Sequence, residues 1–136
     1  MVRLINRDIL FLKKKAEKAT AEDVQVGRDL MDTLAAHADE CVGMAANMIG
    51  VNKAIIVFNA GFMNMLMFNP RIIKKSGRYE TEEGCLSLQG VRPCVRYKDI
   101  EVEYYDSDFK RKTMKLTEFP AQIVQHEIDH LNGIII

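Results

Sequence analysis

Near the carboxyl end of the chain, the stretch QHEIDHLNG (125–133) carries two histidines and a glutamate at the spacing of a metal site. Because His126 and His130 are four residues apart, an α-helix would place both imidazoles on one face, where they can bind a single ion. Glu127 follows the first histidine, and its carboxylate can reach a water on that ion without binding the ion itself. The pattern therefore predicts two metal ligands and a general base on one helix. The alternative is a chance match on an amphipathic helix.

Two imidazoles do not complete a metal site, so a third ligand is required. The sequence ends six residues after His130, which leaves no room for a ligand far downstream. We therefore expect the third ligand upstream, among the acidic residues and His37, Cys41, Cys85 and Cys94. Cys85 is favoured because it follows a glycine in the stretch EGCLS (83–87), where the backbone can approach an ion closely. For each cysteine, the alternative is a small buried side chain without a chemical role.

Composition excludes several classes of protein. The 136 residues include 19 basic and 19 acidic side chains, and a net charge of zero gives no general attraction to nucleic acid or to an anionic membrane. Three cysteines without a CxxC spacing do not form a disulfide framework and suit a reducing cytosol. No secretory signal or membrane span is visible. We expect one cytoplasmic domain covering residues 1–136.

The pattern of apolar residues predicts two helices. The first covers about residues 21–36, after a capping box formed by Thr20 and Asp23. The second follows Thr117, has Pro120 in its first turn, and runs to Leu131 before Asn132-Gly133. Short β-branched and aromatic runs between them predict strands at 53–59, 65–68, 72–75, 91–97, 100–105 and 112–116. The expected fold is α+β, with antiparallel strands packed around the C-terminal HExxH helix, plus one N-terminal helix.

Three stretches together resemble the peptide deformylase family: CVGMAANMIG (41–50), EGCLS (83–87) and QHEIDHLNG (125–133). The resemblance implies that Cys85, His126 and His130 bind the catalytic metal, that water completes a tetrahedral site, and that Glu127 is the acid and base. It implies one ion per chain, Fe²⁺ in most members of the family or Zn²⁺ in a less active form. The implied reaction is hydrolysis of the formyl group from the N-terminal formylmethionine of nascent polypeptides, in a bacterial cytoplasm, with release of formate.

The family stabilises the developing oxyanion with two donors. By resemblance, one is the backbone N–H of the residue after the cysteine, here Leu86, and the other is a glutamine that ends the first motif. This sequence carries Met48 at the glutamine position, and a thioether cannot donate a hydrogen bond. Asn47 and Gln125 are the nearest amides that could replace it. Loss of one such donor costs about 10²–10³ in rate in other enzymes.

The resemblance also implies contacts with the substrate. An arginine near Arg92 contacts the peptide backbone in many family members, and Glu83 belongs to the same stretch of chain. Val42 and Gly43, together with Ile123, are expected to line a pocket for the methionine side chain. Asp129 is expected to orient a partner of the metal ligands, with Arg96 as a candidate for that partner.

Three functions remain open on the sequence. The first is an active deformylase acting on nascent chains. The second is a metal-binding homologue with weak activity that binds N-termini, which Met48 favours and Glu127 opposes. The third is a structural zinc domain, which would need four protein ligands. Transient association with the ribosome stays open, because the further C-terminal helix that some family members use there is not seen after Gly133.

Overall fold

The computed structural model describes residues 1–85 and 88–134. The described helices are α1 (Ile9–Leu12), α2 (Val24–Ala36) and α3 (Glu118–Leu131), with two 3-10 turns, η1 (Ala21–Asp23) and η2 (Ala46–Ile49). The described strands are β1 (Gly43–Ala45), β2 (Ile55–Asn59), β3 (Asn64–Cys85), β4 (Leu88–Tyr105) and β5 (Arg111–Thr117). They form one antiparallel sheet in the order β1-β2-β3-β4-β5. The predicted α+β fold is confirmed.

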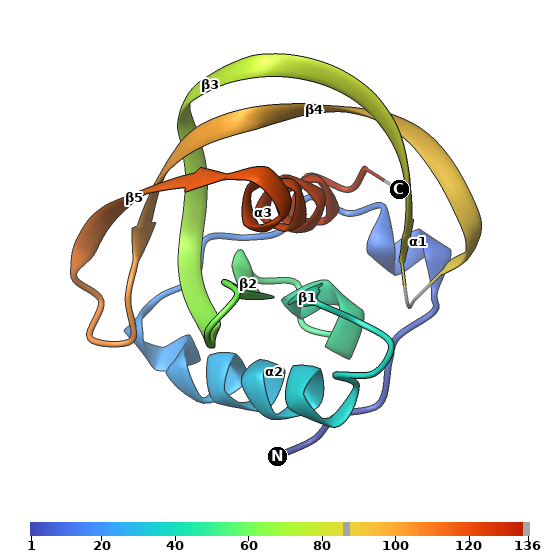
Figure 1. Cartoon of the computed structure of the whole chain (residues 1–136). Coiled ribbons are helices and arrows are strands. Elements are labelled where there is room, and N and C mark those ends of the chain that lie inside the picture. Colours follow the sequence, from blue (N-terminus) through green and yellow to red (C-terminus); the bar gives the residue numbers. More distant parts are fainter. Residues whose placement is uncertain (86–87, 135–136) are drawn as a thin grey trace.

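The sheet encloses the C-terminal helix. Figure 1 shows the long hairpin of β3 and β4 arching over α3, which is seen nearly end-on beneath the arch. On the other side of α3, strands β1 and β2 lie between α3 and α2 and contact both helices. Eight residues of α3 are buried by this arrangement. The carboxyl-terminal helix is therefore held on several sides, which fixes the positions of its histidines.

Strand β2 separates two apolar cores because its side chains alternate between the two faces of the sheet. Ile56 and Phe58 pack with Val124 and Leu131 on the side of α3. Ile55 and Val57 pack with Leu30 and Leu34 on the side of α2. The four apolar residues 55–58 thus pack alternately against α3 and α2.

The helices begin and end close to the predicted positions. Thr20 and Asp23 form the expected capping box, with the Thr20 N–H donating to Asp23 at 2.8 Å, although the first turn is 3-10. Helix α3 follows Thr117 and ends at Leu131, with Asn132 as its C-cap. Gly133 is required at the end because a Cβ there would lie 2.1 Å from the carbonyl oxygen of Lys13. This close approach packs the helix end against the N-terminal segment.

The strands are longer than the sequence patterns predict. Two predicted strands, 65–68 and 72–75, are parts of one strand, β3, and the strands predicted at 91–97 and 100–105 are both parts of β4. The interpretation of Asn69-Pro70 as a break was wrong: the sheet continues past it with a register shift, and Asn69 takes a φ of 50°. The Asn69 side chain is hydrogen-bonded to the backbone of Ala19 at 2.8 and 2.9 Å. That distant partner was invisible in the local sequence.

Three short elements, α1, β1 and η2, were not predicted. Each has only three or four residues, which is too short for a periodic pattern to be seen. Two of them, β1 and η2, come from the first of the three family-like stretches and carry it past α3. Among the described residues, no helix is long and apolar enough to cross a membrane.

Candidate metal centre

Three side chains converge at the end of strand β3 and the middle of α3. The ligand atoms of Cys85, His126 and His130 all lie within 4.8 Å of one another. The Nε2 atoms of the two imidazoles are 3.0 Å apart. Two nitrogens bound at about 2.0–2.1 Å to one tetrahedral ion would be separated by roughly 3.3 Å. The arrangement therefore fits a single ion, and one thiolate with two imidazoles suits zinc or ferrous iron.

Glu83 orients the first of these histidines. Its Oε1 lies 2.7 Å from Nδ1 of His126, and a carboxylate can only accept, so Nδ1 carries a proton and Nε2 is the ring nitrogen that can bind an ion. Arg96, which is buried, donates to both oxygens of Glu83 from Nε and Nη2 at 2.7–3.1 Å. Its Nη1 donates to Asp129 at 2.7 Å, so the expected pairing of Arg96 with Asp129 is present.

The charges of this network are set by its hydrogen bonds. Burial alone would raise the pKa of Glu83, but hydrogen bonds from His126, Arg96 and Gln122 outweigh it and lower that pKa to about 2. Burial works to lower the pKa of His126, but its hydrogen bonds to Cys85 and Glu83 raise it to about 10. Burial and the neighbouring His126 lower the pKa of His130 to about 3. An ion and a proton would compete for the same ring nitrogen, so binding would release protons.

Glu127 is buried beside the ligands with a free acceptor. Its side chain is only 3% exposed, and Oε1 has no hydrogen-bond partner among the described residues. Burial raises its pKa to about 7 against the lowering effect of His126. A Cβ on Gly43 would lie 2.9 Å from Oε2 of Glu127 and 2.5 Å from Ile123, so a glycine is needed where the backbone passes. A carboxylate of this kind is placed to exchange protons near neutral pH.

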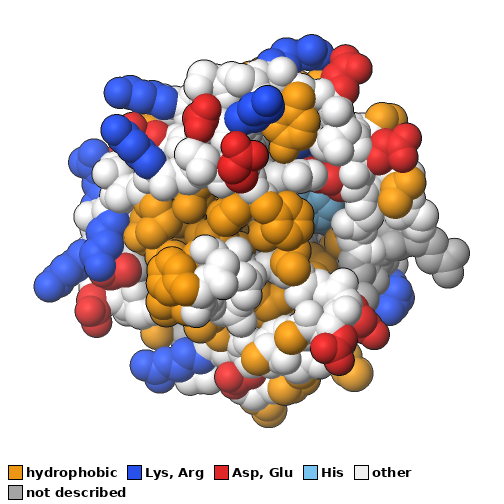
Figure 2. All heavy atoms as spheres, viewed as in Figure 1, with side chains coloured by type: hydrophobic (Ala, Val, Ile, Leu, Met, Phe, Trp, Pro, Cys, Tyr) orange, Lys and Arg blue, Asp and Glu red, His pale blue; other side chains and the backbone are white. Residues whose placement is uncertain are grey.

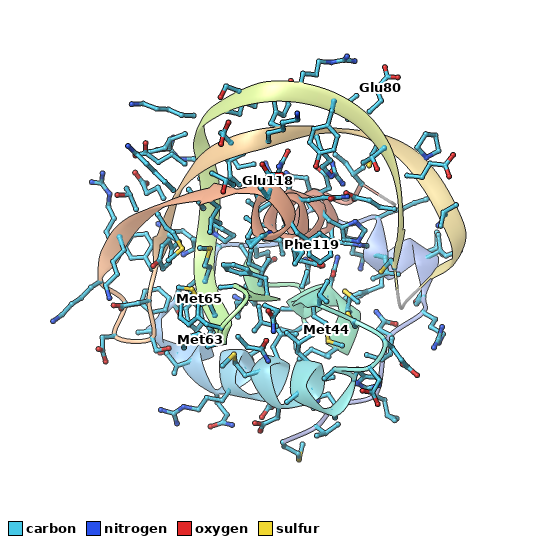
Figure 3. The ribbon with its side chains drawn as sticks, viewed as in Figure 1. Met44, Met63, Met65, Glu80, Glu118 and Phe119 are labelled. Carbon is cyan, nitrogen blue, oxygen red and sulfur yellow. The ribbon has the colours of Figure 1, made fainter. Side chains whose placement is uncertain are left out.

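Cys85, His126 and Glu127 line a cavity of about 640 Å³. In Figure 2, a pale blue histidine surface is visible in a hollow beside a band of apolar side chains. Phe119, labelled in Figure 3, lies in the first turn of α3 and lines this cavity. The cavity is lined by Arg7, Glu40, Cys41, Val42, Gly43, Met48, Glu82, Glu83, Gly84, Cys85, Gly90, Phe119, Gln122, Ile123, His126 and Glu127.

The residues expected to contact substrate fall in different places. Val42, Gly43 and Ile123 line the cavity together. Glu83 also borders it, but its oxygens are engaged by Arg96, His126 and Gln122, so the structure gives it partners within the protein. Arg92 lies opposite Glu83 in the β3–β4 register, and its buried Nη1 has no partner among the described residues. Leu86, the expected backbone donor, lies outside the described residues.

Met48 stands at the cavity wall, where the resemblance expects a glutamine. It is fully buried, and its sulfur accepts a hydrogen bond from the Ala45 N–H at 3.4 Å. The Asn47 amide donates to the His130 carbonyl oxygen at 2.9 Å. The Gln125 amide donates to the carbonyl oxygens of Tyr97 and Ala121. Both amides considered as replacements are therefore used for packing α3 against its neighbours.

Of the other histidine and cysteine candidates, Cys41 is the one among the described residues that line the cavity. Cys41 lines the cavity, where burial and the Glu127 charge raise its pKa to about 12. His37 caps α2 and is hydrogen-bonded to Thr33 at 2.9 Å. Gln122 and Phe119, which line the cavity from α3, were not predicted as site residues. Their spacing of four and seven residues before His126 was the available signal, since these positions share one helix face.

Comparison with known proteins gives a consistent result. The family model for polypeptide deformylase matches residues 2–136. A peptide deformylase of Clostridium beijerinckii is 54% identical over 136 residues, covering 100% of both chains. A crystal structure of a peptide deformylase from Legionella pneumophila is 31% identical with a TM-score of 0.88, covering 99% of this chain and 83% of that one.

A further similar solved structure is that of a peptide-bound enzyme. It is a Met-Ala-Ser-bound class I type b peptide deformylase from Acinetobacter baumannii, 28% identical with a TM-score of 0.87, covering 99% of this chain and 97% of that chain. The family model and this structure therefore both match nearly the whole chain. The chain belongs to the polypeptide deformylase family.

Proposed function

We propose that Cys85, His126 and His130 hold one catalytic metal ion and that Glu127 is the acid and base of the reaction. The chain acts as a peptide deformylase, a metal-dependent hydrolase that removes the formyl group from formylmethionyl nascent polypeptides and releases formate. The observation that supports the site assignment best is the convergence of three ligand atoms within 4.8 Å, beside a buried carboxylate whose Oε1 has no partner in the described part of the chain.

The ligand set decides what the ion can be. A thiolate with two imidazoles suits Fe²⁺ or Zn²⁺, and we propose one ion of either kind per chain. When bound, such an ion supplies Lewis-acid chemistry that activates water and polarises a carbonyl group. A structural zinc domain would need a fourth protein ligand, whereas the cluster among the described residues has three.

The chain's own residues then move the proton and hold the geometry. Glu127 accepts a proton from the attacking water and delivers it to the leaving amine. Glu83, fixed by Arg96, keeps the His126 ring in one orientation and one tautomer. We propose that the backbone N–H of Leu86 donates to the developing oxyanion, as the resemblance implies.

The substrate enters along the apolar wall of the cavity. Val42, Gly43 and Ile123, which line the cavity, are proposed to contact the methionine. Arg92, which pairs with Glu83 across strands β3 and β4, is proposed to contact the peptide backbone. We place the enzyme in the cytoplasm, as one domain covering residues 1–136, with transient association with the ribosome during synthesis. A homologue that merely binds N-termini is not favoured, because it would have no need of the buried Glu127 carboxylate.

Formate release tests this function directly. The protein is loaded anaerobically with Fe²⁺ and given formyl-Met-Ala-Ser, with unformylated Met-Ala-Ser and a Cys85→Ser variant beside it. We expect formate from the formylated peptide, no cleavage of the unformylated one, and loss of activity and metal in the variant. A wild-type protein that holds one ion per chain and releases no formate would leave N-terminus binding as the better account.

A further inference from the structure

One face of helix α3 runs from the cavity mouth to the metal ligands. Phe119, Gln122 and Ile123 line the cavity on the N-terminal side of His126 and Glu127. Phe119 is 56% exposed, while His126 is buried, so the face leads from solvent to the reaction centre. Gln122 precedes His126 by four residues and therefore lies one helical turn, about 5.4 Å, nearer the mouth.

Gln122 is the only amide side chain among the described residues that line this cavity. Its Nε2 donates to Oε2 of Glu83 at 2.8 Å. Because the carboxylate can only accept, this hydrogen bond fixes which end of the amide faces Glu83. The amide has a second N–H and an oxygen, and among the described residues Glu83 is its partner. The remaining N–H is thus held at the cavity wall by a neighbour that is itself locked by Arg96.

The dimensions of formylmethionine bring its sulfur to this level. Five covalent bonds of roughly 1.5 Å separate the formyl carbon from the thioether sulfur, which spans about 6 Å when extended. With the formyl group at the metal ligands, a side chain directed along α3 toward the mouth therefore places its sulfur about one helical turn from His126. Gln122 occupies that turn, with Ile123 and Phe119 as apolar neighbours.

We propose that Gln122 is a specificity-determining residue that donates its second N–H to the thioether sulfur of the substrate. The inference rests on the proposed function, since it names how the same site recognises methionine. Ile123 and Phe119 would accept a thioether or a hydrocarbon of equal length. The Gln122 amide would distinguish the two groups. A thioether sulfur is a weak acceptor for its N–H, whereas a methylene group leaves that N–H without a partner. The enzyme therefore selects methionine over norleucine, which has the same shape with a methylene in place of sulfur.

The test is a ratio of two substrates in the iron-loaded enzyme. We expect kcat/KM for formyl-Met-Ala-Ser to exceed that for formyl-norleucyl-Ala-Ser by about threefold to tenfold, the size of one modest hydrogen bond. In Gln122→Leu the ratio falls to about one. If the substitution also removes the hydrogen bond to Glu83, kcat/KM falls by the same factor for both substrates and their ratio does not change. The ratio therefore reports only the contact with sulfur. If the leucine variant folds poorly, Gln122→Met, which is unbranched and has no amide, should also bring the ratio to about one.

A variant of the neighbouring wall serves as the matched control. Phe119→Leu removes an aromatic ring from the same cavity, and we expect it to change kcat/KM for both peptides by the same factor. An equal kcat/KM for both peptides in the wild type overturns the inference and leaves deformylation intact, as does a ratio that persists in both Gln122 variants. If neither peptide releases formate, the proposed function and the inference are both overturned.

Discussion

Oε1 of Glu83 accepts a hydrogen bond from Nδ1 of His126 at 2.7 Å, across 43 residues of sequence. The pair joins the end of strand β3 to the middle of α3, and Arg96 and Gln122 hold the carboxylate from two other directions. Cys85 follows Glu83 by two residues, so the strand that supplies the thiol also supplies the group that aims an imidazole. Strand β3 and helix α3 therefore form the site as a unit.

Removing the charge of Glu83 should weaken metal binding. We expect Glu83→Gln to lower the affinity for Zn²⁺ by about 10–100-fold, because the amide oxygen is a weaker acceptor for Nδ1 of His126. Competition with a chromogenic chelator measures the change. Glu80→Gln is the matched control: Glu80 lies on the same strand, faces solvent (Figure 3) and forms an exposed ion pair with Arg78 at 3.6 Å. Unchanged affinity in Glu83→Gln would refute an orienting role.

Glu127 should be needed for turnover and not for metal binding. We expect Glu127→Gln to lower kcat by about 10²–10⁴-fold, since a glutamine cannot exchange the proton, while the metal content stays at one ion. Formate release and elemental analysis give the two readings. Glu118→Gln, an exposed carboxylate at the start of the same helix, should leave kcat within about twofold (Figure 3). Loss of the ion from Glu127→Gln would make Glu127 a ligand instead.

Met48 should limit the rate. Gln125 uses both N–H groups of its amide for backbone carbonyl oxygens. Asn47 donates to the His130 carbonyl oxygen and is not among the described residues that line the cavity. We expect Met48→Gln, which has similar length and can accept the same Ala45 N–H, to raise kcat by about 10²-fold. Met48→Leu, without a donor, should give no gain. If the glutamine variant is fully loaded with metal and no faster, another group already stabilises the oxyanion.

Glu118 carries backbone strain at the start of α3. Its φ of 53° lies in the left-handed region, which a residue with a Cβ adopts at a cost. We expect Glu118→Gly to raise the free energy of unfolding by about 1 kcal/mol, measured by urea denaturation. Glu118→Ala keeps the Cβ and should give no such gain. Equal stabilities for the glycine and alanine variants would mean that the left-handed conformation is not retained in solution.

Two cysteines should resist alkylation. Burial and the nearby Glu127 raise the pKa of Cys41 to about 12, and burial raises that of Cys94 to about 11 despite Arg96. A thiol reacts as its thiolate, which exists above the pKa, so at pH 8 only about 1 in 10³–10⁴ of these groups is reactive. Iodoacetamide labelling followed by mass spectrometry should show both cysteines labelled slowly until urea unfolds the protein. Rapid labelling of the folded protein would contradict the raised pKa values of both thiols.

Local signals predicted helix α3 and the close approach of His126 and His130 well. Thr117 and Gly133 stand at its two ends, and the spacing of His126 and His130 does not depend on distant contacts. The thiol of Cys85 could be chosen only through resemblance, because spacing alone left three cysteines open. The long strands were missed for the opposite reason: Asn69 continues the sheet through hydrogen bonds with Ala19, 50 residues away.

The role of Glu83 also lay beyond local patterns. Its partners Arg96 and His126 are 13 and 43 residues away, so only the folded chain brings them together. Asn47 is a second example. Its amide has the chemistry of an oxyanion donor, but in the fold it donates to the carbonyl oxygen of His130, 83 residues away. Residue type predicts what a side chain can do, and long-range contacts decide whether it is available.

X-ray absorption of the protein loaded with one Zn²⁺ or Fe²⁺ tests the metal site most directly. The account predicts one sulfur at about 2.3 Å for zinc, two imidazole nitrogens at about 2.0–2.1 Å, and an exchangeable oxygen ligand. Cys85→Ser should remove the sulfur signal, and Cys41→Ser should leave it unchanged. A first shell without sulfur, a sulfur that survives Cys85→Ser, or a fourth ligand from the protein would contradict the assignment.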